Sequence, residues 1–189
     1  EIKGGTITIK GKLVNFDLTE AGITSVDLHG QTALKVINLK KNEIATFKQD
    51  GMPALTELNL RDNKLTTFSG TGMTSLKTLN LQGNQLDSHE FDITDASATL
   101  TELTVSDNGD KFITLNLVAF TALEYFYCDD NPEFTTAVFA DNNANINKIS
   151  MNNCHVMHFY SCTFPNLYSL NLSNNALLEL EDGNYPKLS

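Results

Sequence analysis

Two aspartates, Asp107 and Asp130, come nearest in this sequence to a pair of catalytic or metal-binding groups. They occupy the same place in adjacent copies of a repeated segment. On neighbouring strands they would stand about 4.8 Å apart, close to the ~5–5.5 Å between the carboxyl groups of a retaining glycosidase. Carboxylate oxygens so placed would also suit Ca²⁺. The competing interpretation, which we favour, is that polar turn residues recur because the sequence repeats, on an open face without a water-excluded pocket.

Cysteines and histidines near the carboxyl end have a spacing seen among zinc ligands: Cys154, His155, His158 and Cys162. A structural zinc site needs four ligands that converge in a tetrahedron. In the repeat described below, Cys154 takes an inward position and His155 an outward one. We therefore interpret this spacing as coincidental and expect no metal.

Nothing else in the sequence assembles a reactive site. The segment Gly70-Thr71-Gly72 is not placed between a strand and a helix, as a phosphate-binding loop would be. His29 and His89 have no candidate nucleophile beside them. We expect neither an enzyme nor a bound cofactor.

The elements that must position these residues are copies of one segment, which residues 55–65 show most clearly. It reads L-x-x-L-x-L-x-x-N-x-L, the leucine-rich-repeat signature. The asparagine position recurs in steps of 21, 21, 21, 24, 23, 23 and 21 residues, at Ala21, Asn42, Asn63, Asn84, Asn108, Asn131, Cys154 and Asn175. Such a register through eight copies predicts one solenoid.

One repeat predicts one short strand, because residues 4 and 6 of the signature alternate with polar residues. We expect Leu58 and Leu60 to point inward and Asn59 outward, in a parallel sheet. An inward amide at Asn63 would satisfy backbone groups where the chain leaves the strand. The return segments predict extended and turn structure with little helix, except for one helical turn within 87–99. We assign residues 1–12 to an N-terminal cap strand and 13–189 to about eight solenoid turns, with a ninth beginning at Leu188.

Segments such as Ser25-Val26-Asp27-Leu28 and Thr114-Leu115-Asn116-Leu117 resemble the bacterial 21-residue leucine-rich repeats of surface and secreted proteins, of the type common in Bacteroidetes. The resemblance covers about residues 13–189. It implies a right-handed solenoid that belongs to the α/β class by family but is rich in strands, with a parallel sheet on its concave face. It also implies extracellular protein or glycan binding, as in adhesion, and supplies no catalytic residue.

Composition narrows the classes of partner. The formal net charge of −10 argues against nucleic acid, which binds basic surfaces. No apolar run approaches the ~18 residues of a membrane span. The sequence begins at Glu1 without a signal peptide, and we expect the native protein to be exported, to the cell surface or beyond, from a longer precursor. Cys128 and Cys154 fall on inward positions, so we expect buried free thiols.

The concave face is the predicted working surface, because signature positions 3, 5, 7 and 8 should point outward from the sheet. In the fifth to seventh copies these positions also include Ser106, Lys148 and Ser150. Tyrosine offers a large contact area at a low entropy cost, which suits a protein or glycan partner. The residues that we assign to this binding surface are Lys40, Arg61, Glu102, Asp107, Tyr125, Tyr127, Asp129 and Asp130.

Three functions remain open on this sequence. The first is a non-catalytic extracellular recognition module that binds a protein or a glycan through the concave face. The second is a structural spacer or stalk within a larger surface protein. The third and most remote is a hydrolytic or metal-dependent site at Asp107 and Asp130. The full gene sequence would discriminate best among these three functions. A surface anchor or a fused catalytic domain encoded there would shift the balance among them.

Overall fold

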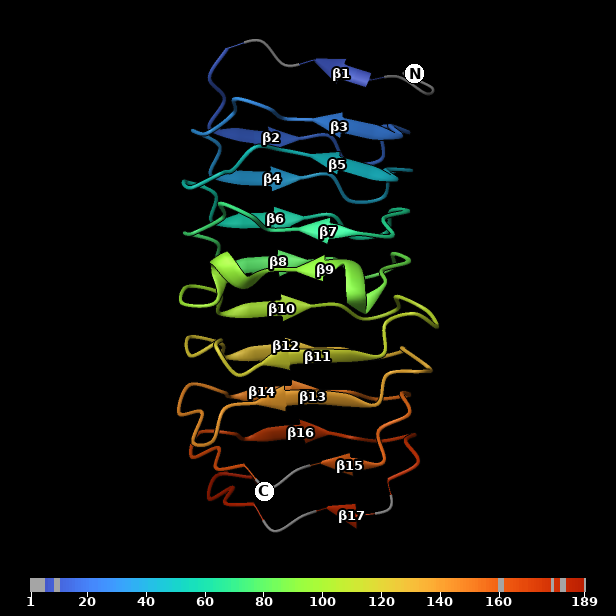
Figure 1. Ribbon diagram of the computed structural model, residues 1–189, viewed down its shortest axis with the longest axis vertical. Helices are drawn as coiled ribbons and strands as arrows, with labels where there is room; N and C mark the ends of the chain where they lie inside the picture. The colour runs from blue at the N-terminus through green and yellow to red at the C-terminus, as the bar shows by residue number, and fades with distance from the viewer. Residues whose placement is uncertain (1–5, 9–10, 160–161, 178, 181–182, 189) are drawn as a thin grey trace.

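The chain folds into a column of stacked turns with strands on two opposite sides (Figure 1). The computed structural model describes residues 6–8, 11–159, 162–177, 179–180 and 183–188. Each turn contributes a short strand to one side, reverses, and returns along the other side. The arrangement confirms the predicted parallel-sheet solenoid.

One side carries a single eight-stranded parallel sheet, whose outer surface we call the long-sheet face. Its strands follow one another in chain order, and the register of each pair places equivalent positions of successive repeats side by side. The strands are β2 (Asn15–Asp17), β4 (Val36–Asn38), β6 (Glu57–Asn59), β8 (Thr78–Asn80), β10 (Glu102–Thr104), β12 (Tyr125–Tyr127), β14 (Lys148–Ser150) and β16 (Ser169–Asn171).

The opposite side, which we call the split-sheet face, carries four separate parallel sheets. One sheet contains β1 (Thr6–Thr8), β3 (Ser25–Asp27) and β5 (Thr46–Lys48), and a second contains β7 (Phe68–Ser69) and β9 (Phe91–Asp92). The third contains β11 (Thr114–Leu117) and β13 (Thr136–Phe139), and the last contains β15 (His158–Phe159) and β17 (Glu179–Leu180).

Helix is confined to two short 3-10 turns in the described part of the chain, η1 (Ser88–Glu90) and η2 (Thr94–Ala96). Both lie in the long return segment where a helical turn was predicted. The side chain of Asp87 caps η1 by accepting from the backbone N–H of His89. At the amino end, β1 pairs with β3, while residues 1–5 and 9–10 of the predicted cap lie outside the described residues.

The core is the continuous interior between the two faces. Leu58 and Leu60 are fully buried and Asn59 is half-buried on the outer side, as predicted. The same alternation holds in the neighbouring turns, where the leucine positions are within a few percent of complete burial. Burying these side chains in every turn drives stacking, because a single turn removes too little apolar surface from water to fold alone.

The asparagine position forms a hydrogen-bonded ladder along the column, which confirms its predicted role. Asn63 donates from Nδ2 to the carbonyl of Leu60 at 2.9 Å and to that of Leu39, one turn earlier, at 3.0 Å. Its Oδ1 accepts from the backbone N–H of Ile44 at 3.0 Å. The same three kinds of bond recur at Asn42, Asn84, Asn108, Asn131 and Asn175.

The residue just before the ladder position has a positive φ in every turn. Asp107 has φ 55° and Asp130 has φ 58°. The remaining members of this column are Glu20, Lys41, Asp62, Gly83, Asn153 and Asn174. Aspartate, asparagine and glycine tolerate this left-handed conformation better than other residues do. The recurrence of aspartate at this position therefore has a conformational cause, which agrees with the turn interpretation of Asp107 and Asp130.

Candidate binding surface

Strand β12 brings the two predicted tyrosines onto the long-sheet face. Tyr125 and Tyr127 flank the fully buried Phe126, so both point outward, and both are half-buried against their neighbours. The register places Tyr125 between Glu102 of β10 and Lys148 of β14. The two tyrosines and Glu102 are therefore neighbours on one face.

Three further residues, which were not among those predicted for the site, complete a patch with these neighbours. The ammonium group of Lys148 lies over the ring of Tyr127, 5.1 Å from its centroid, in a cation–π arrangement. Tyr168, with 52% of its surface exposed, interacts with Tyr125, as does Asn147. We call the set formed by Glu102, Tyr125, Tyr127, Asn147, Lys148 and Tyr168 the tyrosine patch.

The signal that could have found Tyr168 lies in signature position 2. Tyr168 precedes β16 by one residue, as Asn147 precedes β14 and Glu124 precedes β12. Side chains at this position lie at the entry edge of the sheet, and long ones reach over it. Counting only positions 3, 5, 7 and 8 as outward left this column out of the predicted surface.

Both central tyrosines are neutral at physiological pH, and their environment raises the pKa of each further above that range. The neighbouring Tyr168 raises the pKa of Tyr125 above its ordinary value, and partial desolvation and Glu124 add to the effect. Partial burial raises the pKa of Tyr127, and the nearby Glu102 raises it further. The patch therefore presents phenol hydroxyl groups that can donate as well as accept hydrogen bonds.

The carboxylate of Asp129 is occupied within the fold. Its Oδ1 accepts from the hydroxyl of Ser150 at 2.6 Å and from the backbone N–H of Asn152 at 2.7 Å. Ser106 in turn accepts from the backbone N–H of Asp129 at 3.0 Å. Ser106 and Ser150 are 4% and 5% exposed, so the prediction that they face solvent was wrong. Both serine side chains are small, and Asp129, to which each is hydrogen-bonded, shields them from solvent.

The other predicted acidic residues lie at the edge of the sheet rather than on its strands. Asp107 and Asp130 are exposed in the left-handed turns that follow β10 and β12. Asp130 accepts from Nδ2 of Asn153 at 2.9 Å, which links it to the next turn. Among the described residues, no three His, Cys, Asp or Glu side chains lie together in a way that could hold a metal ion.

The predicted basic residues are far from the tyrosines along the column. Arg61 follows β6 and is paired with Asp62 at 3.2 Å, and Lys40 follows β4. Two strands, β8 and β10, separate β6 from β12. With neighbouring strands about 4.8 Å apart, Arg61 lies roughly 14 Å from the tyrosine strand. The structure does not bring the basic and aromatic residues into one site.

The two inward cysteines are buried and outside any disulfide. Burial raises the pKa of the Cys128 thiol well above its ordinary value. Cys154 takes the ladder position and donates to the carbonyl of Cys128 at 3.0 Å, which is the inter-turn bond that asparagine makes elsewhere. His155 is exposed, as expected from its position. In the described part of the chain, no helix has the length and apolar character needed to cross a membrane.

Comparisons with known proteins agree with this architecture. The family model for the leucine rich repeat matches residues 46–86. No curated protein matches the chain. Among solved structures, the chain is similar to the functional domain of InlJ from Listeria monocytogenes, with 22% sequence identity and a TM-score of 0.67. The alignment covers 89% of this chain and 41% of the InlJ chain, so this chain spans less than half the length of the InlJ chain.

The fold is a leucine-rich-repeat solenoid. The structure of InlJ includes a cysteine ladder, whereas the solenoid described here has an asparagine ladder in which Cys154 replaces one member. Cys128 lies in the adjacent turn but at signature position 6, so the two cysteines do not occupy one column. The tyrosine patch lies outside residues 46–86, which the family model matches, in the fifth to eighth copies of the repeat.

Proposed function

We propose that this leucine-rich-repeat solenoid is a non-catalytic recognition module that binds a protein partner through the tyrosine patch. The observation that carries the proposal is the clustering of Tyr125, Tyr127 and Tyr168 on a face otherwise lined mainly by Asn, Thr and Ser. Large, rigid side chains with a polar tip bury contact area at a low entropy cost, and tyrosine is enriched at interfaces for this reason.

The geometry of the patch supports an interaction surface rather than a reaction centre. Tyr125 and Tyr127 already lose part of their solvent contact to Lys148 and Tyr168, which holds their rings in place before binding. Preorganised side chains reduce the entropy lost on association. The patch contains the carboxylate of Glu102, and the carboxylate of Glu124 lies beside it. Together with the net charge of −10 for the chain, these groups favour a basic partner.

A glycan is the second candidate for the same patch. Asn147 and Glu124 beside Tyr125 offer amide and carboxylate groups that bond hydroxyl groups, next to an aromatic face on which a sugar ring can stack. We further propose that the module belongs to an exported bacterial surface protein, on the resemblance of its repeats. The alternative of a spacer requires only the rigid column and leaves the tyrosines without a role.

The test is a binding screen with matched variants. The wild type is applied to a panel of extracellular proteins and to a glycan array, and each hit is measured again with the Tyr125→Ala/Tyr127→Ala variant. Removing two anchors at the centre of an interface should weaken binding at least about tenfold. The matched control is Val36→Ala/Thr78→Ala, which shortens two outward side chains of β4 and β8 away from the patch.

Charge is tested in the same way. Glu102→Gln should weaken the binding of a basic partner. Glu57→Gln, at the same repeat position on β6, should leave that binding unchanged. Hits that bind wild type and the double tyrosine variant equally, at equal stability, would remove the tyrosine patch as the binding site. If hits appear only on the glycan array, the glycan replaces the protein as the proposed ligand of the patch.

A further inference from the structure

Pockets lie along the split-sheet face where one of its sheets ends and the next begins. The sheets end between β5 and β7, between β9 and β11, and between β13 and β15. A pocket lies at each of these breaks. Where neighbouring strands do not pair, their side chains separate and leave the space open.

The pocket at the break between β13 and β15 differs from the others in its chemistry. Its volume is about 430 Å³, within the range of small-molecule sites. Its walls are mainly apolar and come from two successive turns: Thr136, Ala137, Val138, Phe139, Asp141, Phe159 and Cys162. By contrast, the pocket between β5 and β7 is lined mostly by polar and charged residues, among them His29, Lys48, Gln49 and Asp50.

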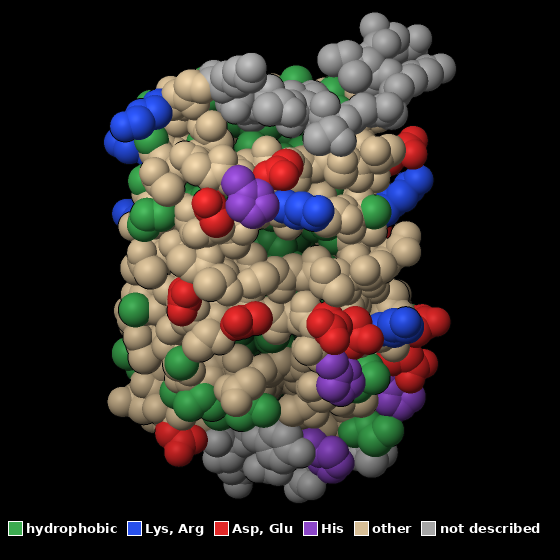
Figure 2. All heavy atoms as spheres, turned by 45° about the horizontal axis from the view of Figure 1, so that its top comes forward, with side chains coloured by type: hydrophobic (Ala, Val, Ile, Leu, Met, Phe, Trp, Pro, Cys, Tyr) green, Lys and Arg blue, Asp and Glu red, His purple; other side chains and the backbone are tan. Residues whose placement is uncertain are grey.

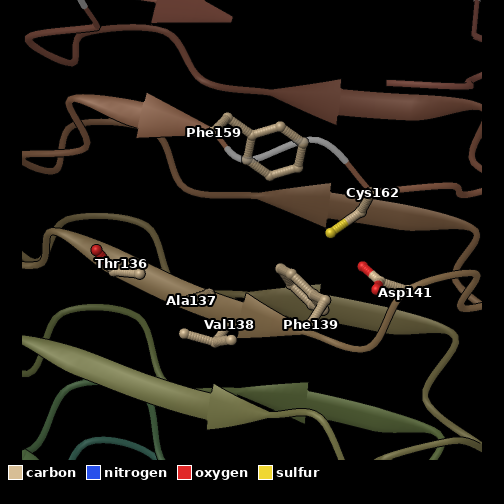
Figure 3. Close-up of a pocket in the computed structure, with 7 residues that line it drawn as sticks. All are labelled: Thr136, Ala137, Val138, Phe139, Asp141, Phe159 and Cys162. Atoms are coloured by element: carbon tan, nitrogen blue, oxygen red, sulfur yellow. The ribbon is translucent and has the colours of Figure 1, made fainter. Parts of the chain in front are cut away.

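A rigid aromatic base supports this apolar pocket. The rings of Phe139 and Phe159 are almost fully buried, and both contact Phe164, with centroid separations of 5.4 Å and 6.3 Å. Figure 3 shows Phe159 and Cys162 on the segment that faces Phe139 across the pocket. The two phenylalanine walls are therefore held by the core itself before any ligand arrives.

One charged group stands at the pocket. Asp141 follows β13 by two residues, and its carboxylate points toward Cys162 (Figure 3). It is exposed and forms no ion pair within the described part of the chain. A ligand that fills the apolar walls would thus meet a single negative charge at one end.

The surface around the pocket is apolar as well. Val138, on its rim, is 43% exposed, and Ile113, Val118 and Met157 on the neighbouring turns are also large exposed apolar side chains. Figure 2, which looks onto the split-sheet face, shows hydrophobic side chains gathered over its lower part, below a band of acidic residues. Exposed apolar surface that is grouped rather than scattered indicates a binding site.

We propose that this pocket binds a small organic cation with an aromatic or aliphatic body. The body lies against Ala137, Val138 and Phe139, and the ammonium or guanidinium group faces the carboxylate of Asp141. The net charge of −10 raises the local concentration of such cations and lowers that of anions. The site lies on the face opposite the tyrosine patch, so it is independent of the function proposed above.

The test compares three probes of nearly equal shape: 2-phenylethylamine, 2-phenylethanol and phenylacetate. Binding is followed at low salt by the NMR shifts of the Ala137 and Val138 methyl groups, which localise the ligand as well as measure its Kd. We expect the amine to bind about twofold to fivefold more tightly than the alcohol, because pairing with an exposed carboxylate contributes little. The anion should bind most weakly of the three.

Two variants with the same change of charge serve as test and control. Asp141→Asn should remove the preference for the amine and leave binding of the alcohol unchanged. Asp110→Asn should keep the preference, since Asp110 precedes β11 and lies at the opposite end of the paired strands β11 and β13. Both residues are exposed, so both variants should fold.

Several results would overturn the proposal. The first is the absence of methyl shifts at Ala137 and Val138 with any probe at millimolar concentration. The second is equal binding of the amine and the alcohol by the wild type. The third is an amine preference that survives in Asp141→Asn. None of these outcomes bears on the tyrosine patch, whose test uses other residues and other partners.

Discussion

The amide oxygen of Asn63 accepts a hydrogen bond from the backbone N–H of Ile44, which lies one full turn earlier, at 3.0 Å. The amide nitrogen of the same side chain bonds the carbonyls of Leu39 and Leu60. One side chain thus satisfies three buried backbone groups in two turns. The ladder position joins the turns on the inside, where water cannot replace it.

Replacing this side chain should therefore lower stability. Asn63→Ala is expected to reduce the free energy of unfolding by roughly 1–3 kcal/mol, because it leaves buried backbone groups without partners. Urea denaturation measures the change. Thr78→Ala, an outward substitution on β8, is the control for loss of side-chain contacts at the surface. An unchanged midpoint for Asn63→Ala would contradict the structural role of the ladder.

Cys154 is the weak member of the ladder, and restoring the amide should strengthen it. The thiol donates to the carbonyl of Cys128 at 3.0 Å, but it lies 3.6 Å from the carbonyl of Asn152 and cannot supply the second donor of an amide. Cys154→Asn should raise the free energy of unfolding by about 1 kcal/mol, while Cys154→Ala should lower it. Chemical denaturation under reducing conditions compares the three proteins. A Cys154→Asn variant less stable than Cys154→Ala would show that the pocket around this thiol cannot accept an amide.

Gly72 and Gly30 form a matched pair on the split-sheet side. Both have φ +75°, and each N–H donates to an aspartate of a following turn. A Cβ on Gly72 would stand 2.7 Å from the Cα of Gly51, whereas one on Gly30 would meet nothing within 4 Å. Gly30→Ala should cost about 1–2 kcal/mol for the left-handed backbone alone. Gly72→Ala should cost roughly 1–3 kcal/mol more because of the clash. Thermal or urea unfolding of the two variants tests this, and equal losses would refute the contribution of close turn packing.

Acid should destabilise the solenoid through aspartates that accept hydrogen bonds in its turns. Hydrogen bonds from the side chain and backbone of Thr94 lower the pKa of Asp92, and hydrogen bonds from Thr19 and Asn38 lower that of Asp17. A carboxyl whose pKa is lower in the folded state stabilises that state above its unfolded pKa, near 3.8, and loses this contribution as pH falls through the folded value. The urea midpoint should hence decline below about pH 4.

The variant Asp92→Asn gives the matched comparison for this pH dependence. Asparagine can still accept the backbone N–H of Thr94, at 2.9 Å in the native chain, but it does not titrate. Its stability should fall less steeply in acid than that of the wild type. Identical pH profiles for the two proteins would show that Asp92 does not contribute.

The long sheet could be predicted from the sequence because every copy repeats the same local pattern. Once Leu58 and Leu60 are assigned inward, pairing of equivalent positions leaves one register for all eight strands. The split-sheet face lacks this simplicity. Its strands begin at varying distances from the ladder position. Val26 and its partner Phe47 stand equally far from their ladder residues, whereas Leu115 and its partner Ala137 do not. The breaks, and the apolar pocket at one of them, depend on packing that no template encodes.

The tyrosine patch was predicted only in part, for a related reason. The alternation of β12 was enough to place Tyr125 and Tyr127 outward. Tyr168 lies at a position that alternation does not classify, and its reach toward Tyr125 depends on the side-chain conformation. Conversely, Ser106 and Ser150 follow the outward pattern but are covered, because both bond Asp129. Alternation predicts the direction of a side chain and not what its neighbours cover.

The long return segment that carries η1 and η2 leaves the pairing of the long sheet unchanged. Thr78 still lies beside Glu102, and Leu79 beside Leu103, although the chain between them is longer than in the preceding turns. The additional residues are thus accommodated at the rim of the column, outside the paired strands. A peptide tag or a small domain inserted in η1, beside the exposed His89 and Glu90, should be carried at the rim without disturbing the stacked turns. The spacing of side chains presented by the long sheet would keep its native pitch.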